Sequence, residues 1–188
     1  MSLHPIDNPS SRQAYSDEEL DKFMVFCLLD RAMPYEKVCK VFDWIDRLGL
    51  TTRKGIRDSG YSIQELALAL HTKGESHRFP NTTARFLYQF GRNRIDLRRA
   101  TREEIVDHVL GMGYKLASMY LRNTRGEKYA VLDIHVRRWL AEKGIKGKNY
   151  KDLEAKFLVK CKELGQSPYD LDLKIWQERR IGNRKGKK

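Results

Sequence analysis

Apolar residues recur at helical spacing along most of the chain. The clearest stripe runs from Leu20 to Leu28 and follows Ser16, a residue type typical of helix N-caps. Apolar side chains three and four positions apart line one face of a helix, and an N-cap hydroxyl accepts a hydrogen bond from the free N–H groups at its start. We therefore predict a helix that begins after Ser16.

Start and stop signals divide the rest of the chain into further helices. Ser62 and Thr101 are each followed three positions later by glutamate, which is the pattern of a capping box. Prolines that can open a helix and glycines that can close one stand at Pro34, Gly49, Pro80, Gly165 and Pro168. These signals predict successive short helices separated by tight turns.

Strand patterns are nearly absent from the chain. Only the run from Tyr129 to Leu132 has strand character, and it is too short to start a sheet. We predict an all-α fold, a compact array of about eight or nine helices in two small lobes. The length of 188 residues suits a single domain over residues 1–188.

The charge balance indicates a polyanionic partner. The chain has 37 Lys and Arg against 25 Asp and Glu, a formal net charge of +12. Basic residues concentrate in a C-terminal tail at about residues 177–188. Nucleic acid and an anionic membrane surface both fit, but the basic residues do not form the one amphipathic helix that membrane binding requires.

Several classes of protein are disfavoured. The longest apolar run, Phe23 to Leu29, is too short to span a membrane, and the first residues lack the pattern of a secretory signal. We expect an intracellular protein, cytoplasmic or at the nucleoid in a prokaryote. Cys27, Cys39 and Cys161 are too few and scattered for a disulfide framework or a thiolate metal site, and we expect Cys27 and Cys161 to be buried.

The segment from Thr101 to Leu140 carries the most informative chemistry. It predicts a hairpin motif at about residues 101–125, two helices joined by a break that contains Gly111 and Gly113. Glycines allow a sharp turn, and the free N–H groups at the start of the second helix attract an anion such as a DNA phosphate. A Gly-x-Gly pair is also typical of an ordinary helix turn.

Lys115 and Asp133 are the candidate catalytic residues. Lys115 lies in the first turn of the second helix, where the helix dipole disfavours a cation and favours a neutral, nucleophilic amine. Asp133 stands where a third helix begins. Taken separately, the two positions are better explained by their ordinary roles, a surface lysine and an N-cap aspartate.

Together these residues match a known pattern. GMGYK at residues 111–115, followed by LDIH at residues 132–135, resembles the helix–hairpin–helix glycosylase superfamily. Residues 111–140 are similar to the small archaeal-type branch of 8-oxoguanine DNA glycosylase/lyases, whose motif reads roughly G-x-G-x-K-x-A-S-H-F-L-R-N and then A-x-L-D-x-H-x-L-R. RFPN at residues 78–81 and LDLKIW at residues 171–176 also agree with that branch.

The resemblance implies the reaction. In this branch the lysine attacks C1′ of the damaged nucleotide, expels the base and forms a Schiff base, after which β-elimination cleaves the strand. Lys115 would be this nucleophile, and Asp133 would stay ionised and stabilise positive charge on the sugar. DNA contacts are implied at Gly111 and Gly113 of the hairpin and at the two residues His135 and Arg137.

The resemblance also implies a base pocket. Trp176 would stack on the extruded base. Met119 stands where the branch usually has histidine, and it would lie against the same pocket. Asp30 and Arg31 stand where the branch tends to have a small polar loop near the gap left by the flipped base, so Arg31 is a candidate to fill that gap.

The predicted function is therefore a bifunctional 8-oxoguanine DNA glycosylase/AP lyase. Its partner would be double-stranded DNA that contains oxidised guanine, bound by a monomer. We expect no side-chain metal site and no cofactor, although hairpins of this superfamily can hold an ion through backbone carbonyls. The alternatives are a glycosylase/lyase for another lesion and a non-catalytic helix–hairpin–helix module that only binds DNA. A basic membrane-surface protein is a further alternative.

Overall fold

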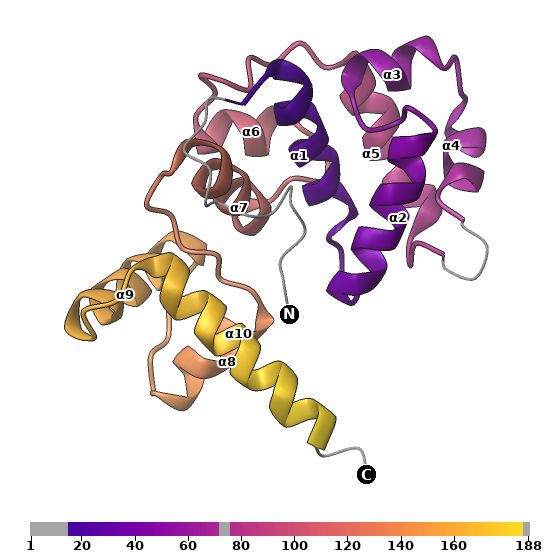
Figure 1. Cartoon of the computed structure of the whole chain (residues 1–188). Helices are drawn as coiled ribbons and strands as arrows, with labels where there is room; N and C mark the ends of the chain where they lie inside the picture. Colours follow the sequence, from indigo (N-terminus) through magenta and orange to yellow (C-terminus); the bar gives the residue numbers. More distant parts are fainter. Residues whose placement is uncertain (1–14, 72–75, 186–188) are drawn as a thin grey trace. The chain divides into compact units, whose positions relative to one another are not determined.

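A computed structural model of the chain describes residues 15–71 and 76–185, and describes side chains as far as residue 179 (Figure 1). The described residues form ten helices and no strand, so the predicted all-α fold is confirmed. The helices are α1 (Asp17–Leu29), α2 (Tyr35–Arg47), α3 (Arg53–Asp58), α4 (Ile63–Ala69), α5 (Pro80–Arg92), α6 (Arg102–His108), α7 (Tyr114–Arg125), α8 (Ile134–Glu142), α9 (Tyr150–Glu163) and α10 (Pro168–Lys185).

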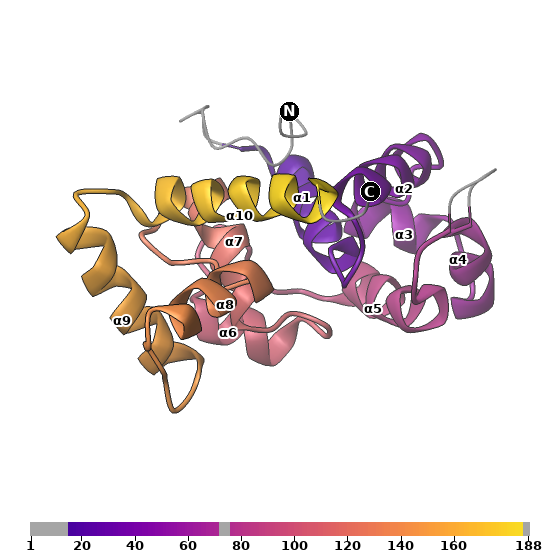
Figure 2. The same cartoon turned by 90° about the horizontal axis from the view of Figure 1, so that it is seen from below.

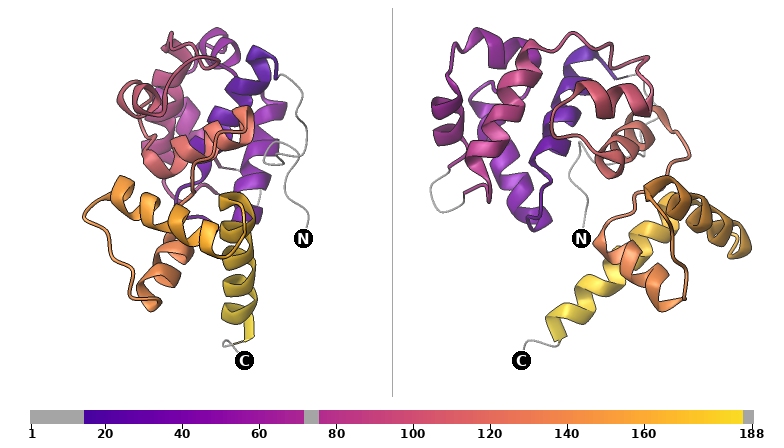
Figure 3. Two further views of the ribbon diagram at one scale, coloured as in Figure 1. Left: turned by 90° about the vertical axis from the view of Figure 1, so that its left-hand side faces the viewer. Right: turned by 180° about the vertical axis from the view of Figure 1, so that it is seen from behind.

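The chain divides into two compact units, residues 1–126 and residues 127–188. In the first unit α1 packs against α2, α5 and α7 (Figures 1 and 2). In the second unit α10 packs against both α8 and α9 (Figure 3). Helices α1 to α7 therefore build one core, and α8 to α10 build another.

Helix α1 is the central element of the first unit. Every residue from Phe23 to Leu29 is buried, so this helix has no solvent-facing stripe in its second half. A helix that is apolar all round must be covered on several sides, which its three neighbouring helices achieve. Cys27 is fully buried within it, as predicted.

The helix caps predicted from the sequence are present in the structure. Ser16, Ser62 and Thr101 each form a full capping box with the glutamate three positions later. Helix α5 begins at Pro80, and α10 begins at Pro168. These local signals predicted most helix starts correctly because capping involves only neighbouring residues.

One short helix was not predicted. Helix α3 has only six residues, and Ile56 is the one member that is buried. A single buried side chain produces no apolar periodicity, so the pattern gives no signal there. The N-cap of this helix does give a signal, because the hydroxyl of Thr52 accepts a hydrogen bond from the N–H of Gly55.

The second unit has a small core between its three helices. Leu140 of α8, Phe157 and Cys161 of α9, and Ile175 of α10 are buried together. Burial raises the pKa of the Cys161 thiol to about 11. The thiol therefore stays protonated at neutral pH and acts as a small apolar side chain, as predicted.

Among the helices of residues 15–71 and 76–185, none is long and apolar enough to cross a membrane.

Candidate active site

Helices α6 and α7 form the predicted hairpin, and residues 109–113 join them. Gly111 has φ of +93°, a conformation that only glycine adopts without strain. A Cβ atom at this position would lie 2.5 Å from Cδ2 of Phe86, a buried residue of α5. Any side chain at position 111 would thus strain the backbone and collide with the ring beneath it.

Gly113 serves a different purpose at the start of α7. It is the N-cap, and it makes no side-chain capping hydrogen bond. No described neighbouring atom lies within 4 Å of the position its Cβ would take. Whereas α4 and α6 begin with a hydroxyl cap, α7 begins with a glycine that has no side chain to cap it, an arrangement that suits an anion from outside.

Lys115 lies in the first turn of α7 and forms an ion pair with Asp30. Asp30 is the C-cap residue of α1, and its backbone N–H donates to the carbonyls of Phe26 and Cys27. The side chains of Lys115 and Asp30 are 30% and 25% exposed, so water is only partly excluded from the pair. The candidate nucleophile therefore has an acidic partner that the sequence did not predict.

His77 fixes the turn that carries Asp30. Its Nε2 lies 3.0 Å from the carbonyl oxygen of Leu29, and its Nδ1 accepts from the N–H of Phe79. Burial lowers the pKa of His77, so the ring is neutral at pH 7 and Nε2 donates to Leu29. Through this bond α1 is held at the residue directly before Asp30.

Arg31 packs on the aromatic ring of Phe86. Its guanidinium carbon lies 4.6 Å from the centre of the Phe86 ring, which is the ring beneath Gly111. A cation over an aromatic face contributes about 0.5–2 kcal/mol. Gap filling by Arg31 stays a prediction, and it requires this contact to open.

Met119 lies one turn after Lys115 on α7, and its side chain is buried in the first unit. The two helices of the hairpin are joined through Arg102, which donates to the hydroxyl of Ser118 and lies over the ring of Tyr114. This buried contact keeps the first turn of α7 in place against α6.

Asp133 is the N-cap of α8 in the second unit. Its carboxylate accepts a hydrogen bond of 2.8 Å from the N–H of Val136. The positive end of the helix dipole stabilises the ionised carboxylate. Asp133 therefore has the ordinary capping role, and its role as a charged catalytic group stays a prediction.

Three side chains accept hydrogen bonds from the backbone directly before Asp133. The N–H groups of Ala130, Val131 and Leu132 lack strand partners, and each donates instead to a side-chain oxygen. The acceptors, in the same order, are Glu154 at 3.0 Å, Asp172 at 3.3 Å and Tyr150 at 3.2 Å. This segment is the run that had strand character in the sequence, and side chains replace the neighbouring strand it lacks.

Tyr150 and Arg137 complete this attachment. The hydroxyl of Tyr150 donates to the carbonyl of Ala130 at 2.9 Å. Arg137 donates from Nε to the carbonyl of Leu132 and lies over the Tyr150 ring. His135, the second residue of α8, is half-buried. Arg137 therefore holds the segment before Asp133, and DNA contacts by Arg137 and His135 stay predictions.

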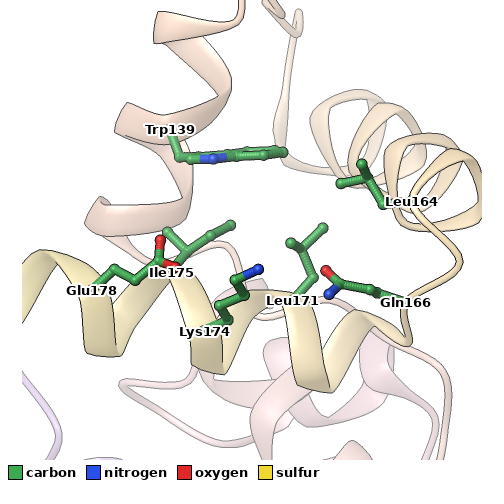
Figure 4. A pocket seen from close by; sticks show the side chains of 7 residues that line it. All are labelled: Trp139, Leu164, Gln166, Leu171, Lys174, Ile175 and Glu178. Carbon is green, nitrogen blue, oxygen red and sulfur yellow. The ribbon is translucent and has the colours of Figure 1, made fainter.

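Trp176 lies on α10 and is half-buried. The cleft in the second unit is lined by another tryptophan, Trp139 of α8, opposite Leu171 and Ile175 of α10 (Figure 4). This cleft has a volume of about 220 Å³, and Lys174 stands on its α10 side. The base-stacking role of Trp176 stays a prediction, and the structure adds Trp139 as a partly exposed aromatic face.

The sequence interpretation missed the residues that hold the candidate catalytic groups. Glu154 had a detectable signal, because it shares the apolar face of α9 with Phe157 and Cys161, where a carboxylate needs a buried partner. Asp30 had no such signal, since its partner Lys115 is 85 positions away. Tyr150 begins α9 and gave no signal either.

The chain matches a model of known sequences over residues 7–166, and that model describes 8-oxoguanine DNA glycosylase. The 8-oxoguanine DNA glycosylase/AP lyase of Korarchaeum cryptofilum is 30% identical over 178 residues, which cover 86% of this chain and 80% of the relative. The enzyme of the same description from Thermoplasma volcanium is 27% identical, with 85% of this chain and 86% of the relative covered.

Solved structures agree with these relatives. The crystal structure of the 8-oxoguanine DNA glycosylase of Thermotoga maritima superposes with a TM-score of 0.66 at 26% identity, covering 86% of this chain and 79% of that one. The 8-oxoguanine glycosylase/lyase of Methanocaldococcus jannaschii, crystallised with a 15mer DNA containing 8-oxoguanine, gives 0.65 at 27% identity, with coverage of 87% and 82%. From the family model, the relatives and the hairpin that carries Lys115, we conclude that this chain belongs to the 8-oxoguanine DNA glycosylase family.

Proposed function

We propose that the protein is a bifunctional DNA glycosylase/AP lyase that removes 8-oxoguanine from double-stranded DNA and then cleaves the strand. The observation that carries this proposal is the uncapped start of α7 with Lys115 in its first turn. A helix start without a side-chain cap suits a DNA phosphate, and the amine beside it would reach the sugar of the same strand. The related glycosylase/lyase crystallised with 8-oxoguanine DNA supports the choice of lesion.

In the proposed reaction, the neutral amine of Lys115 attacks C1′ of the damaged nucleotide. The bond from C1′ to the base breaks, and the base leaves with the electron pair and takes up a proton. The sugar ring then opens as the bond from C1′ to O4′ breaks, O4′ takes up a proton, and the nitrogen and C1′ form a Schiff base. Loss of a proton from C2′ and β-elimination then break the bond to the 3′ phosphate. A base must first leave the helical stack, which costs a few kcal/mol.

Asp133 is proposed to stabilise the positive charge that develops on the sugar. Its carboxylate is held by the N–H of Val136 and by the dipole of α8, so it is already oriented before the reaction. A preoriented charge needs no reorganisation when the transition state forms. The side chains that fasten residues 130–132 contribute to this by fixing the backbone.

Gly111, Gly113, His135 and Arg137 are proposed to contact the DNA backbone, and Trp176 and Met119 to contact the extruded base. The protein is proposed to act as a monomer inside the cell, in the compartment that contains the DNA. Residues 1–188 are proposed to form one glycosylase domain, since the family match of residues 7–166 extends across both units. Schiff-base chemistry by lysine needs no metal or other cofactor, so we expect activity to survive EDTA.

Borohydride trapping tests the proposal. Reduction captures a Schiff base as a covalent protein–DNA adduct on a duplex with one 8-oxoguanine, and we expect an adduct with this duplex and none with undamaged DNA. Adducts only with another lesion would replace 8-oxoguanine in the proposal. No adduct with any lesion, while DNA binding persists, would identify a non-catalytic module.

A further inference from the structure

We propose that Asp30 is a positioning residue that holds Lys115 as an ammonium ion in the DNA-free protein, and that their ion pair must open before Lys115 attacks. The inference rests on the proposed nucleophilic role of Lys115. It adds a residue from α1 to a site that the sequence placed on α7 and at the start of α8. It also divides the activation of Lys115 into two steps, opening of the pair and loss of a proton.

The pair joins two rigid elements. Asp30 ends α1, where Leu28 and Leu29 are fully buried, and Lys115 lies in the first turn of α7, where Leu116 is buried. Helices α1 and α7 pack directly against each other. The two charged groups are therefore brought together by the core of the first unit, and the pair does not depend on flexible surface segments.

Two influences act in opposite directions on the charge of Lys115. The start of α7 presents the positive end of the helix dipole, which disfavours an ammonium ion. The carboxylate of Asp30 contacts Nζ and favours the ammonium ion. A direct ion pair that is more than two-thirds buried on both sides outweighs the dipole of one helix end.

The other charged groups near the pair do not replace Asp30. Arg31 follows it and lies over Phe86, and His77, bonded to Leu29, is neutral at pH 7. On the hairpin side, Arg102 of α6 lies over the ring of Tyr114. These three neighbours are cationic or neutral and supply no carboxylate, so they do not replace the negative charge that Asp30→Asn removes.

The consequence is that the ion pair with Asp30 keeps Lys115 protonated and unreactive until DNA binds. Attack on C1′ requires the lone pair of Nζ, so Lys115 must give up one proton to water and leave the carboxylate of Asp30. When DNA binds, the negative charge of a phosphate at the start of α7 and the positive charge that develops on the sugar change the electrostatic potential around the Lys115–Asp30 ion pair. In the DNA-free protein, Asp30 keeps the lysine in place and protects it from other electrophiles.

Three variants test this proposal in the full chain. Asp30→Asn removes the charge and keeps the size, whereas Asp30→Glu keeps the charge. The matched control is Asp58→Asn, which breaks the exposed Lys54–Asp58 pair in α3 of the same unit and changes the net charge equally. Thermal unfolding of each variant shows whether the fold is retained.

The first readout is the pH profile of borohydride trapping on a duplex that contains an abasic site. We expect the pH of half-maximal trapping to fall by about one unit in Asp30→Asn. Asp30→Glu and Asp58→Asn are expected to keep the wild-type profile. A folded Asp30→Asn variant with the wild-type profile would overturn the proposal.

The second readout needs no DNA. Formaldehyde with cyanoborohydride methylates neutral lysine amines, and peptide mass spectrometry compares Lys115 with the exposed Lys128. We expect Lys115 to be labelled about tenfold faster in Asp30→Asn than in the wild type. Equal rates would overturn the proposal. If the wild type formed no adduct, the proposed function would fail, while this labelling would still decide the role of Asp30.

Discussion

The two units hold their candidate catalytic side chains in different ways. In the first unit, Lys115 is held through its own charged group, which pairs with Asp30. In the second unit, Asp133 is held through the backbone that precedes it, because the N–H groups of residues 130–132 donate to buried side chains. The first attachment acts on the amine of the candidate nucleophile, and the second acts on the backbone next to Asp133.

This difference predicts different responses to substitution. An ion pair between partly exposed groups can open without loss of structure, since water replaces each partner. A buried N–H group that loses its acceptor has no such replacement and destabilises the fold. Changes around Lys115 should therefore alter reactivity, and changes around residues 130–132 should alter stability and activity together.

The largest expected effect comes from removal of the nucleophile. Lys115→Gln should reduce adduct formation and strand cleavage by on the order of 10³-fold or more, because glutamine has no amine to form a Schiff base. Duplex binding, measured by fluorescence anisotropy, should stay within about threefold of the wild type, since the hairpin N–H groups remain. Strand cleavage at the wild-type rate would rule out Lys115 as the nucleophile.

Asp133→Asn separates the charge of Asp133 from its capping role. Asparagine is an equally good N-cap, so the free energy of unfolding should change by less than about 0.5 kcal/mol. Single-turnover cleavage of the lesion should fall by about 10²-fold or more, because the positive charge on the sugar loses its carboxylate. Full activity in this variant would limit Asp133 to a structural role.

Tyr150→Phe tests the backbone attachment in the second unit. It removes the acceptor for the N–H of Leu132 and the donor for the carbonyl of Ala130. Urea unfolding should show a loss of about 1–3 kcal/mol. The matched control, Tyr61→Phe, alters a tyrosine that is 36% exposed and should have little effect. Equal stability of the two variants would show that residues 130–132 are held by other means.

The smallest expected effect is a pH dependence from His77 in the first unit. Burial places its folded-state pKa below the ordinary value of 6.5, so the unfolded chain binds the proton more readily. The contribution of neutral His77 is fully present above pH 6.5 and is lost as the pH falls below it.

Thermal unfolding at pH 7.0 and 5.5 checks this effect. The wild type should lose about 1 kcal/mol of stability between these two pH values. In His77→Gln the loss should be smaller, although this variant is less stable at both. An equal pH dependence in both proteins would exclude His77 as its source.

The parts of the fold that the sequence predicted depend on neighbouring residues. The capping boxes at Ser16, Ser62 and Thr101 and the glycine turn at Gly111 all involve residues within a few positions of one another. Helix α3 was not predicted, because its one buried residue, Ile56, produces no helical periodicity of apolar positions. Local signals are sufficient for most helix ends in this all-α chain.

The contacts that the sequence did not predict depend on tertiary packing. Asp30 meets Lys115 only because α1 packs on α7, and no local pattern marks that contact. The run at residues 129–132 had strand character from its apolar side chains, whereas in the structure the N–H groups of residues 130–132 donate to Tyr150, Glu154 and Asp172. The candidate nucleophile was predicted, whereas the groups that hold it were not.

The most direct test of the account is to identify the residue in the trapped adduct. Wild-type protein reduced on an 8-oxoguanine duplex is digested with protease and nuclease, and mass spectrometry locates the sugar remnant. The account predicts the remnant on Lys115. A remnant on another lysine, or on the terminal amine, would contradict the assignment of the hairpin lysine as the nucleophile.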